Sequence, residues 1–365
     1  MERERNLGLD FLRMLSMLMV VVLHLLGRGG VLADAVPFTA NYWIAWALES
    51  AAYCAVNCYA LLSGYLLVKS RCPLGGLIGL WLQVFCYSAG ITALFAIFYE
   101  PVSLTRFLQA CLPVTFTQYW YFTAYFAVYL LAPFFNRLIA NLSREAFRRL
   151  LWTVFLLFSV LTTVFHQDPF ITGNAANGPG YSFLWLAALY FGGAYLRLYP
   201  PRQEKSRVWL LGYLGCLGAL LLFRLGAESV TYACTGTASY GGWLLTYPSP
   251  LVVGEAVCLF HACRCARWNG RAARRIIGFF APVSFGVYLI HAQPFVFHRI
   301  LNGAAVSLLS LPGWQFALAL PAAALGIFLA GSLVDWTRLG LFRLLGIRRL
   351  AEFLGEKLQR CLPPI

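Results

Sequence analysis

Charged side chains are scarce in this sequence, and acidic ones most of all. Of 365 residues, only 12% are Asp, Glu, Lys or Arg, and 14 are acidic, whereas 60% are apolar or aromatic. A soluble domain carries roughly twice this share of charge. The apolar excess is too large for the interior of a water-soluble fold, so the composition indicates a protein embedded in a membrane.

Several other features are also missing. The first apolar run contains Asp10 and Arg13 and is followed by no small-residue cleavage site, so we expect no removable signal peptide. The 11 cysteines are scattered through apolar runs, which is not the arrangement of a disulfide framework. His261, Cys263 and Cys265 fit no standard zinc spacing, so we expect no metal site.

Long apolar runs dominate what is present. A helix that crosses the bilayer needs about 20 mostly apolar residues. We predict an all-α, polytopic bundle of about ten transmembrane helices, at residues 7–27, 42–68, 74–99, 118–136, 150–166, 181–199, 208–225, 242–262, 277–299 and 314–337. The run at 150–166 is the shortest of these.

The basic residues predict the orientation of this bundle. With the amino terminus in the cytoplasm, 23 of the 28 Lys and Arg fall in cytoplasmic segments, and Arg13 lies inside a span. Cytoplasmic loops are enriched in such residues, so both termini are expected in the cytoplasm. The net charge of +14 therefore reflects topology, and we expect no nucleic-acid partner. The outer ends hold only Arg28, Arg106, Arg224 and Arg299.

We divide the chain into a transmembrane domain, residues 1–337, and a basic cytoplasmic tail, residues 338–365. The tail alternates basic and apolar residues, which is typical of an amphipathic helix on the inner leaflet.

Three ionisable side chains are concentrated in the first predicted helix. Asp10 and Arg13 are three residues apart and hence neighbours on one helix face. His24 follows eleven residues after Arg13, which is about 20° past three full turns and about 16 Å along the axis. A buried neutral imidazole can act as a general base, and an arginine fork recognises phosphate or carboxylate. Two structural alternatives stay open: an Asp10–Arg13 pair at the interface, and His24 capping a neighbouring helix.

These residues belong to motifs that resemble the type-3 membrane acyltransferases. Arg5-Asn-Leu-Gly-Leu-Asp-Phe-Leu-Arg13 followed by His24 is similar to the first-helix signature of that family. Three further segments are similar to later helices of the family, in the expected order, so that the resemblance spans residues 5–336. They are Ala55-Val-Asn-Cys-Tyr-Ala-Leu-Leu-Ser-Gly-Tyr65, the aromatic stretch from Tyr119 to Asn136, and Ser284-Phe-Gly-Val-Tyr-Leu-Ile-His291.

The resemblance implies an enzyme that moves an acyl group, usually acetyl, from cytoplasmic acetyl-CoA to a sugar hydroxyl of a cell-surface or lipid-linked carbohydrate. It implies no permanently bound cofactor, since acyl-CoA is a donor substrate, and a location in the bacterial plasma membrane, with the lipid bilayer as a further partner. His24 and Arg13, with Asp10 beside them, carry over as the catalytic residues. The candidate acceptor-binding residues are Asn57, Trp120, Tyr121, Tyr125, Tyr288 and His291.

Other interpretations accompany some of these residues. The aromatic side chains could instead form an interfacial belt, and His291 could cap a helix. Lys69 and Arg71 are fewer cations than many family members carry after the second helix, so other basic clusters could hold the CoA phosphates or serve topology alone. Two other functional classes also stay open: a transporter or flippase of lipid-linked sugars, disfavoured by the lack of internal repeats, and a non-catalytic sensing module.

Overall fold

The computed structural model describes residues 6–167, 178–202, 205–266, 268 and 270–361. Helices build this part of the chain, and it contains no β-strand. The predicted all-α bundle is therefore confirmed. In the first half of the chain the helices are α1 Leu7–Gly27, α2 Val31–Asp34, α3 Ala40–Ala52, α4 Ala55–Leu67, α5 Leu74–Phe98, α6 Leu104–Cys111, α7 Trp120–Ala140, α8 Arg144–Phe155, η1 Leu156–Leu161 and α9 Thr162–Phe165. In the second half they are α10 Phe183–Leu198, α11 Ser206–Thr235, α12 Pro250–Cys265, α13 Arg271–Phe280, η2 Ala281–Val283, α14 Ser284–His291, η3 Val296–Ile300, η4 Val306–Ser310, α15 Gly313–Leu344 and α16 Ile347–Cys361.

Eight helical segments in the described chain are long and apolar enough to cross a membrane. They coincide with eight of the ten predicted spans, including the short run at 150–166, which lies in a continuous helical segment, Arg144–Phe165. The other two predicted spans correspond to α10 and α12, of 16 residues each. At 1.5 Å per residue such a helix is about 24 Å long, somewhat less than the hydrocarbon thickness.

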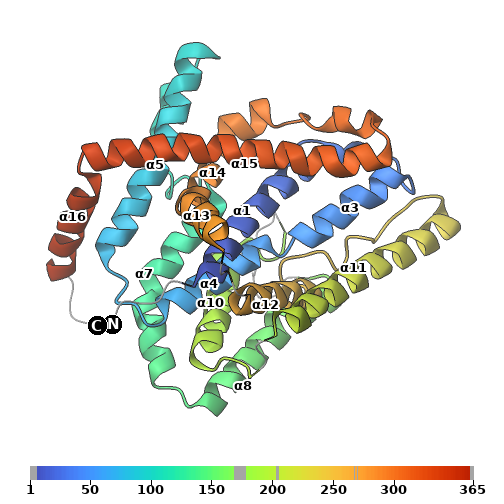
Figure 1. The fold of residues 1–365 in the computed structure, drawn as a ribbon, viewed down its shortest axis with the longest axis horizontal. Coiled ribbons are helices and arrows are strands. Elements are labelled where there is room, and N and C mark those ends of the chain that lie inside the picture. Colours follow the sequence, from blue (N-terminus) through green and yellow to red (C-terminus); the bar gives the residue numbers. More distant parts are fainter. Residues whose placement is uncertain (1–5, 168–177, 203–204, 267, 269, 362–365) are drawn as a thin grey trace.

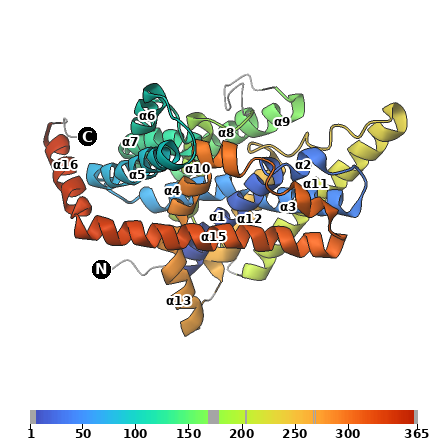
Figure 2. The ribbon, with the colours of Figure 1, turned by 90° about the horizontal axis from the view of Figure 1, so that it is seen from above.

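Helix α1 is the hub of the bundle. It lies centrally in both orthogonal views, packed against α3, α4, α12, α14 and α15 (Figures 1 and 2). Its capping explains where it begins, because the Asn6 side chain accepts a hydrogen bond from the backbone of Leu9. The ten residues from Ser16 to Leu25 are buried except for Leu18 and His24, which are half-buried. The polar side chains of this stretch, Ser16 and His24, are therefore largely enclosed by protein.

A close crossing of α4 and α10 fixes the second layer of helices. A side chain at Gly64 would collide with the backbone of Tyr190, and one at Gly193 would collide with the backbone of Leu61. Only glycine allows the two helix backbones to approach this closely. The Ser63-Gly64 pair of the sequence motif thus has a packing role.

The carboxyl-terminal region of the described chain consists of the helices α15 and α16. Helix α15 crosses the molecule from one side to the other and continues to Leu344 (Figures 1 and 2). The chain then turns at Gly346, where φ is +63°, and α16 packs against α5. Several apolar side chains of α16 remain exposed, among them Leu350, Phe353 and Leu358.

Candidate active site

A cavity of about 520 Å³ lies where α1 ends. We call this side of the bundle the His24 end, and the side where α1 begins the Arg13 end. Residues of the second half of α1, from Met17 to Arg28, form one wall of the cavity. The other walls come from α3, α4, α14 and the segments before α7, α10 and α12. Helices far apart in the sequence therefore converge on one polar and aromatic chamber.

His24 and His291 meet beside this cavity. His24 Nδ1 lies 2.9 Å from His291 Nε2, and His291 Nδ1 lies 2.6 Å from the carbonyl oxygen of Val287. His24 lines the cavity, whereas His291 is 3% exposed and lies behind it. The two residues are 267 positions apart and belong to α1 and α14.

One proton arrangement satisfies both bonds when the two rings are neutral. The carbonyl of Val287 can only accept, so His291 Nδ1 carries a proton and donates it. His291 Nε2 is then an acceptor, and His24 Nδ1 must be the donor. The proton-free nitrogen of His24 is therefore Nε2, which has no hydrogen-bond partner in the described chain. This is the state that a general base requires.

Aromatic rings form the cavity wall opposite α1. The Trp120 and Tyr181 ring centroids are 4.6 Å apart, and Tyr181 lies 4.8 Å from Tyr247, which lies 5.0 Å from Tyr53. The hydroxyl groups of these tyrosines are protonated near neutral pH, as in any ordinary phenol. Such a wall offers ring faces that stack on sugars and hydroxyls that bond to them.

Asn57 supports this wall from behind. It is fully buried, donates to the carbonyl of Tyr247 at 2.8 Å, and accepts from Trp185 Nε1 at 3.0 Å. Asn57 does not line the cavity. Its amide thus fixes the position of Tyr247, and substrate would contact Tyr247 instead.

The predicted tyrosines of α7 form a ladder that leads away from the cavity. Tyr121 lines the cavity and stacks on Tyr125, with ring centroids 6.4 Å apart and planes 10° apart. Tyr125 lies one turn further along and is followed by Tyr129, at 6.1 Å. Tyr129 donates to the carbonyl of Pro73, which precedes α5. The ladder thus extends from the cavity toward the Arg13 end.

Arg13 and Asp10 lie outside the cavity, at the other end of α1. Arg13 Nη1 is 3.4 Å from Asp10 Oδ1, and 35% of the Arg13 side chain is exposed. Tyr59 connects the two regions because its ring lines the cavity while its hydroxyl donates to the Arg13 carbonyl at 2.8 Å. Arg13 and His24 therefore occupy opposite ends of one helix, with Tyr59 between them.

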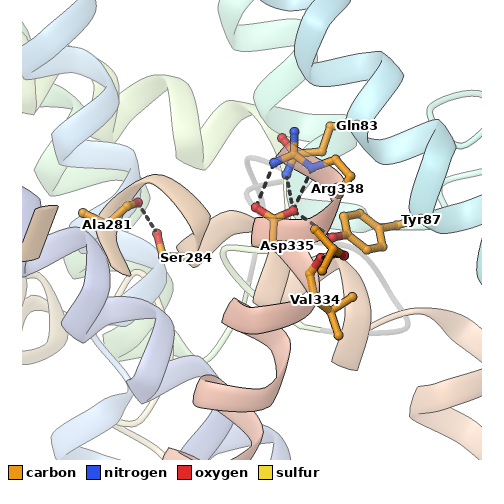
Figure 3. Close-up of polar contacts among 8 residues, drawn as sticks. Gln83, Tyr87, Ala281, Ser284, Val334, Asp335 and Arg338 are labelled. Carbon is orange, nitrogen blue, oxygen red and sulfur yellow. Dashed lines mark hydrogen bonds and ion pairs between the residues drawn. The ribbon is translucent and has the colours of Figure 1, made fainter. Parts of the chain in front are cut away.

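A buried ion pair holds α14 in place. Asp335 is fully buried and forms two hydrogen bonds with Arg338, at 2.8 and 2.9 Å. Figure 3 shows that Gln83 and Tyr87 of α5 approach the same carboxylate. A side chain at Gly286 of α14 would overlap Asp335. The carboxylate thus joins α5, α14 and α15.

Sequence reasoning missed several members of the site. Glu49 of α3 lines the cavity, is 8% exposed, and has no hydrogen-bond partner for Oε2 in the described chain. Tyr53, Tyr181 and Tyr247 were also missed, because each lies in an aromatic-rich segment without a motif of its own. Glu255 of α12 is not one of these, because it lies in the eighth predicted span and does not line the cavity; it is fully buried, and neither carboxylate oxygen has a partner among the described residues.

A family model described as "Acyltransferase domain", of the acyltransferase-3 family, matches residues 6–335. The chain belongs to this family. The predicted resemblance is thereby confirmed over nearly the whole chain, and this acyltransferase-3 protein is a multi-pass membrane acyltransferase. No curated protein and no solved structure matches the chain.

Proposed function

We propose that this acyltransferase-3 protein transfers an acyl group, in the first instance acetyl, from cytoplasmic acyl-CoA to a hydroxyl of a cell-surface or lipid-linked carbohydrate. The Arg13 end of the bundle faces the cytoplasm, and the His24 end faces outward. The protein resides in the bacterial plasma membrane. A transporter or a sensing module would need neither an acyl donor nor a general base.

A single observation supports this proposal most strongly. His24 lines the cavity, and its Nδ1 is engaged by His291, which leaves Nε2 as the nitrogen that can accept a proton. The acceptor of the His24 proton is itself fixed by the Val287 carbonyl. A histidine held in one tautomer beside a sugar-sized aromatic cavity is suited to deprotonating a hydroxyl.

In the proposed reaction, His24 Nε2 takes the proton of the acceptor hydroxyl while the oxygen attacks the thioester carbonyl. The new imidazolium keeps its Nδ1 hydrogen bond to His291. Collapse of the tetrahedral intermediate breaks the carbon–sulfur bond, and the His24 proton passes to the departing thiolate. The products are the acylated sugar and free CoA, so no additional reactant is needed.

The donor would reach His24 along α1 and the tyrosine ladder. Arg13 lies at the expected cytoplasmic end and carries a guanidinium that matches a phosphate group. Tyr59, Tyr121 and Tyr125 lie between that end and the cavity. Their rings would flank the slender pantetheine arm, whereas the charged nucleotide stays at the basic surface. This arrangement brings the thioester to the acceptor without carrying CoA across the membrane.

The acceptor would occupy the aromatic side of the cavity. Trp120, Tyr181 and Tyr247 offer ring faces, and Tyr288 lies next to Tyr121 in the same chamber. Glu49 adds an acceptor for sugar hydroxyls. A ring-stacked sugar with one hydroxyl directed at His24 would be in position for attack.

The test uses purified protein in lipid nanodiscs, deuterium-labelled acetyl-CoA, and surface glycan from cells that lack this protein. Mass spectrometry measures labelled acetyl groups on the glycan. His24→Ala should lower the rate about 10²- to 10⁴-fold, the usual contribution of a general base. His24→Gln should be similarly impaired, because an amide cannot take up a proton at neutral pH.

His261→Gln is the matched control, since His261 is also buried but stacks on Trp209, outside the cavity. It should retain near wild-type transfer. Full activity in His24→Gln would show that hydrogen bonding is sufficient and would contradict the general-base role.

A further inference from the structure

A second cavity, of about 500 Å³, adjoins the first at the His24 end. Thr117, Gln118, Pro294 and His298 line both cavities, so the two are continuous neighbours. The second cavity extends to the end of α5 and to α6. We call the combined entrance, with Arg28, Glu100, Arg106, His298 and Arg299, the vestibule.

The vestibule gathers three guanidinium groups. Arg299 forms a two-point ion pair with Glu100, with contacts of 3.0 and 3.1 Å. Arg106 is exposed and has no side-chain partner among the described residues. Arg28 donates to His298 Nδ1 at 2.7 Å and to the Phe297 carbonyl at 3.3 Å, and no described carboxylate contacts it. Among the described residues that line the two cavities, three arginines thus accompany two glutamates, Glu100 in the vestibule and Glu49 in the first cavity.

His298 adds a hydrogen-bond donor to this group. Its Nδ1 lies 2.7 Å from Arg28, whose guanidinium can only donate, so this nitrogen carries no proton and the imidazole is neutral. Because Arg28 donates to Nδ1, the ring proton of His298 lies on Nε2. The vestibule therefore presents guanidinium groups and an imidazole N–H, all of which bind anions.

The enrichment of basic residues in cytoplasmic loops does not account for arginines at the outer ends of the spans. Only four arginines are predicted at the outer ends of the spans, and three of them line the vestibule. The fourth, Arg224, is accounted for by a buried ion pair with Glu228. Arg28 and Arg106 have no such partner in the described chain. Their clustering beside the cavity calls for a ligand of negative charge.

We propose that the vestibule binds an anionic group of the acceptor, a sugar carboxylate or a phosphate, and that the protein therefore acylates an acidic glycan. This inference rests on the proposed function. The acidic group would contact Arg106 and Arg28, while a neighbouring sugar reaches the aromatic wall and His24. Binding of the acidic group would fix the position of the glycan relative to His24, and this position would determine which hydroxyl is acylated.

The first experiment varies the charge of the acceptor in the transfer assay described above, in nanodiscs of neutral phosphatidylcholine. Glycan from cells that lack the protein is used untreated, with its carboxylates methyl-esterified, or with its phosphates removed by hydrofluoric acid. Removing the recognised group should raise KM about tenfold, as expected for a lost charged hydrogen bond. A change of less than twofold after both treatments together would overturn the proposal.

The second experiment varies the protein. Arg28→Gln and Arg106→Gln should each raise KM for the untreated glycan about tenfold, with kcat changed less than twofold. Arg360→Gln makes the same charge change on the exposed face of α16 and should leave KM unaltered. Equal KM values for Arg106→Gln and Arg360→Gln would contradict the proposal.

A binding measurement separates this inference from the proposed function. Tryptophan fluorescence is titrated with trigalacturonate, with its methyl ester, and with glycerol phosphate trimer. At least one anionic probe should bind, the ester should not, and Arg106→Gln should weaken binding about tenfold. Absence of binding by both anionic probes would refute the vestibule proposal. Failure of the wild-type protein to acylate any glycan would refute the proposed function instead. If phosphatidylglycerol in the nanodisc abolishes anionic-probe binding while glycan charge has no effect on KM, the vestibule recognises lipid and not the acceptor.

Discussion

Replacing His291 with phenylalanine tests whether the hydrogen bond at His24 Nδ1 contributes to the proton transfer at His24 Nε2. The substitution keeps a planar ring in a site that is 3% exposed, so packing should be largely preserved, but it removes the acceptor 2.9 Å from His24 Nδ1. During transfer, His24 becomes an imidazolium, and this hydrogen bond becomes charge-assisted. Such bonds contribute about 1.5–3 kcal/mol. At 1.36 kcal/mol per tenfold, His291→Phe should lower kcat about 10- to 150-fold.

The assay measures kcat and KM for acetyl-CoA by transfer of labelled acetyl to glycan. KM for the donor should change little, because His291 lies behind His24 and does not line the cavity. His291→Gln should recover part of the rate, since its amide oxygen can accept from His24 Nδ1. A melting curve close to wild type for His291→Phe confirms that the loss is not one of folding.

The double variant His24→Ala/His291→Phe decides whether His291 acts through His24. If it does, adding His291→Phe to His24→Ala should cost almost nothing further, because residues that act as a unit are not additive. A full additional loss in the His24→Ala background would show that His291 acts independently. Wild-type kcat in His291→Phe would show that the hydrogen bond between His291 and His24 does not stabilise the transition state.

Two further predictions concern the scaffold. Asp335→Ala leaves the Arg338 guanidinium without its partner, and the Arg338 side chain is only 10% exposed. The substitution should therefore destabilise the protein by about 3–5 kcal/mol in thermal unfolding. The double variant Asp335→Asn/Arg338→Gln should recover much of this stability, because it leaves no buried charge without a partner. Equal stability of Asp335→Ala and wild type would exclude the ion pair as an anchor. A topology reporter fused after Ile365 should report the cytoplasm and one inserted near Gly178 the exterior. A carboxyl terminus found outside would reverse the proposed direction of transfer.

Local sequence patterns predicted the helices well. The first predicted span, 7–27, has the bounds of α1, Leu7–Gly27, because an apolar run flanked by Asn6 and the Gly-rich stretch after it defines both ends. The tenth, 314–337, lies within α15, which extends further to Leu344. That extension alternates basic and apolar residues, and such a pattern does not mark where one helix ends.

The residues that form the site were harder to predict from the sequence than the helices were. The alignment of Arg13 and His24 on α1 followed from helical periodicity, but the partner of His24 did not. His291 lies 267 residues away, and its distance depends on how α1 and α14 cross. Glu49 and Tyr247 were overlooked for the same reason. Their common feature is a shared cavity, which arises from tertiary packing and leaves no local pattern.

The three arginines of the vestibule could not be identified from the sequence as one site. In the sequence, Arg28, Arg106 and Arg299 are only exceptions to the charge asymmetry. In the sequence, each exception to the positive-inside rule is a single residue, and a count of them does not show whether they lie close together in space. The tertiary structure places three of them around adjoining cavities.

The position of His291 depends on contacts that three neighbouring elements make with α14 and the residues that follow it. Helix α14 is the last eight residues of the helical segment Arg271–His291, so His291 lies at the end of that segment and is positioned by side-chain contacts from its neighbours. Tyr119 donates to the Leu289 carbonyl at 2.8 Å, Gln293 donates to Thr92 at 3.0 Å, and Asp335 packs against Gly286. These contacts come from the start of α7, from α5 and from α15, and none involves the reacting atoms. Because a displacement of about 1 Å can cost 10²-fold in rate, these distant ties contribute to catalysis by keeping His291 within hydrogen-bonding distance of His24.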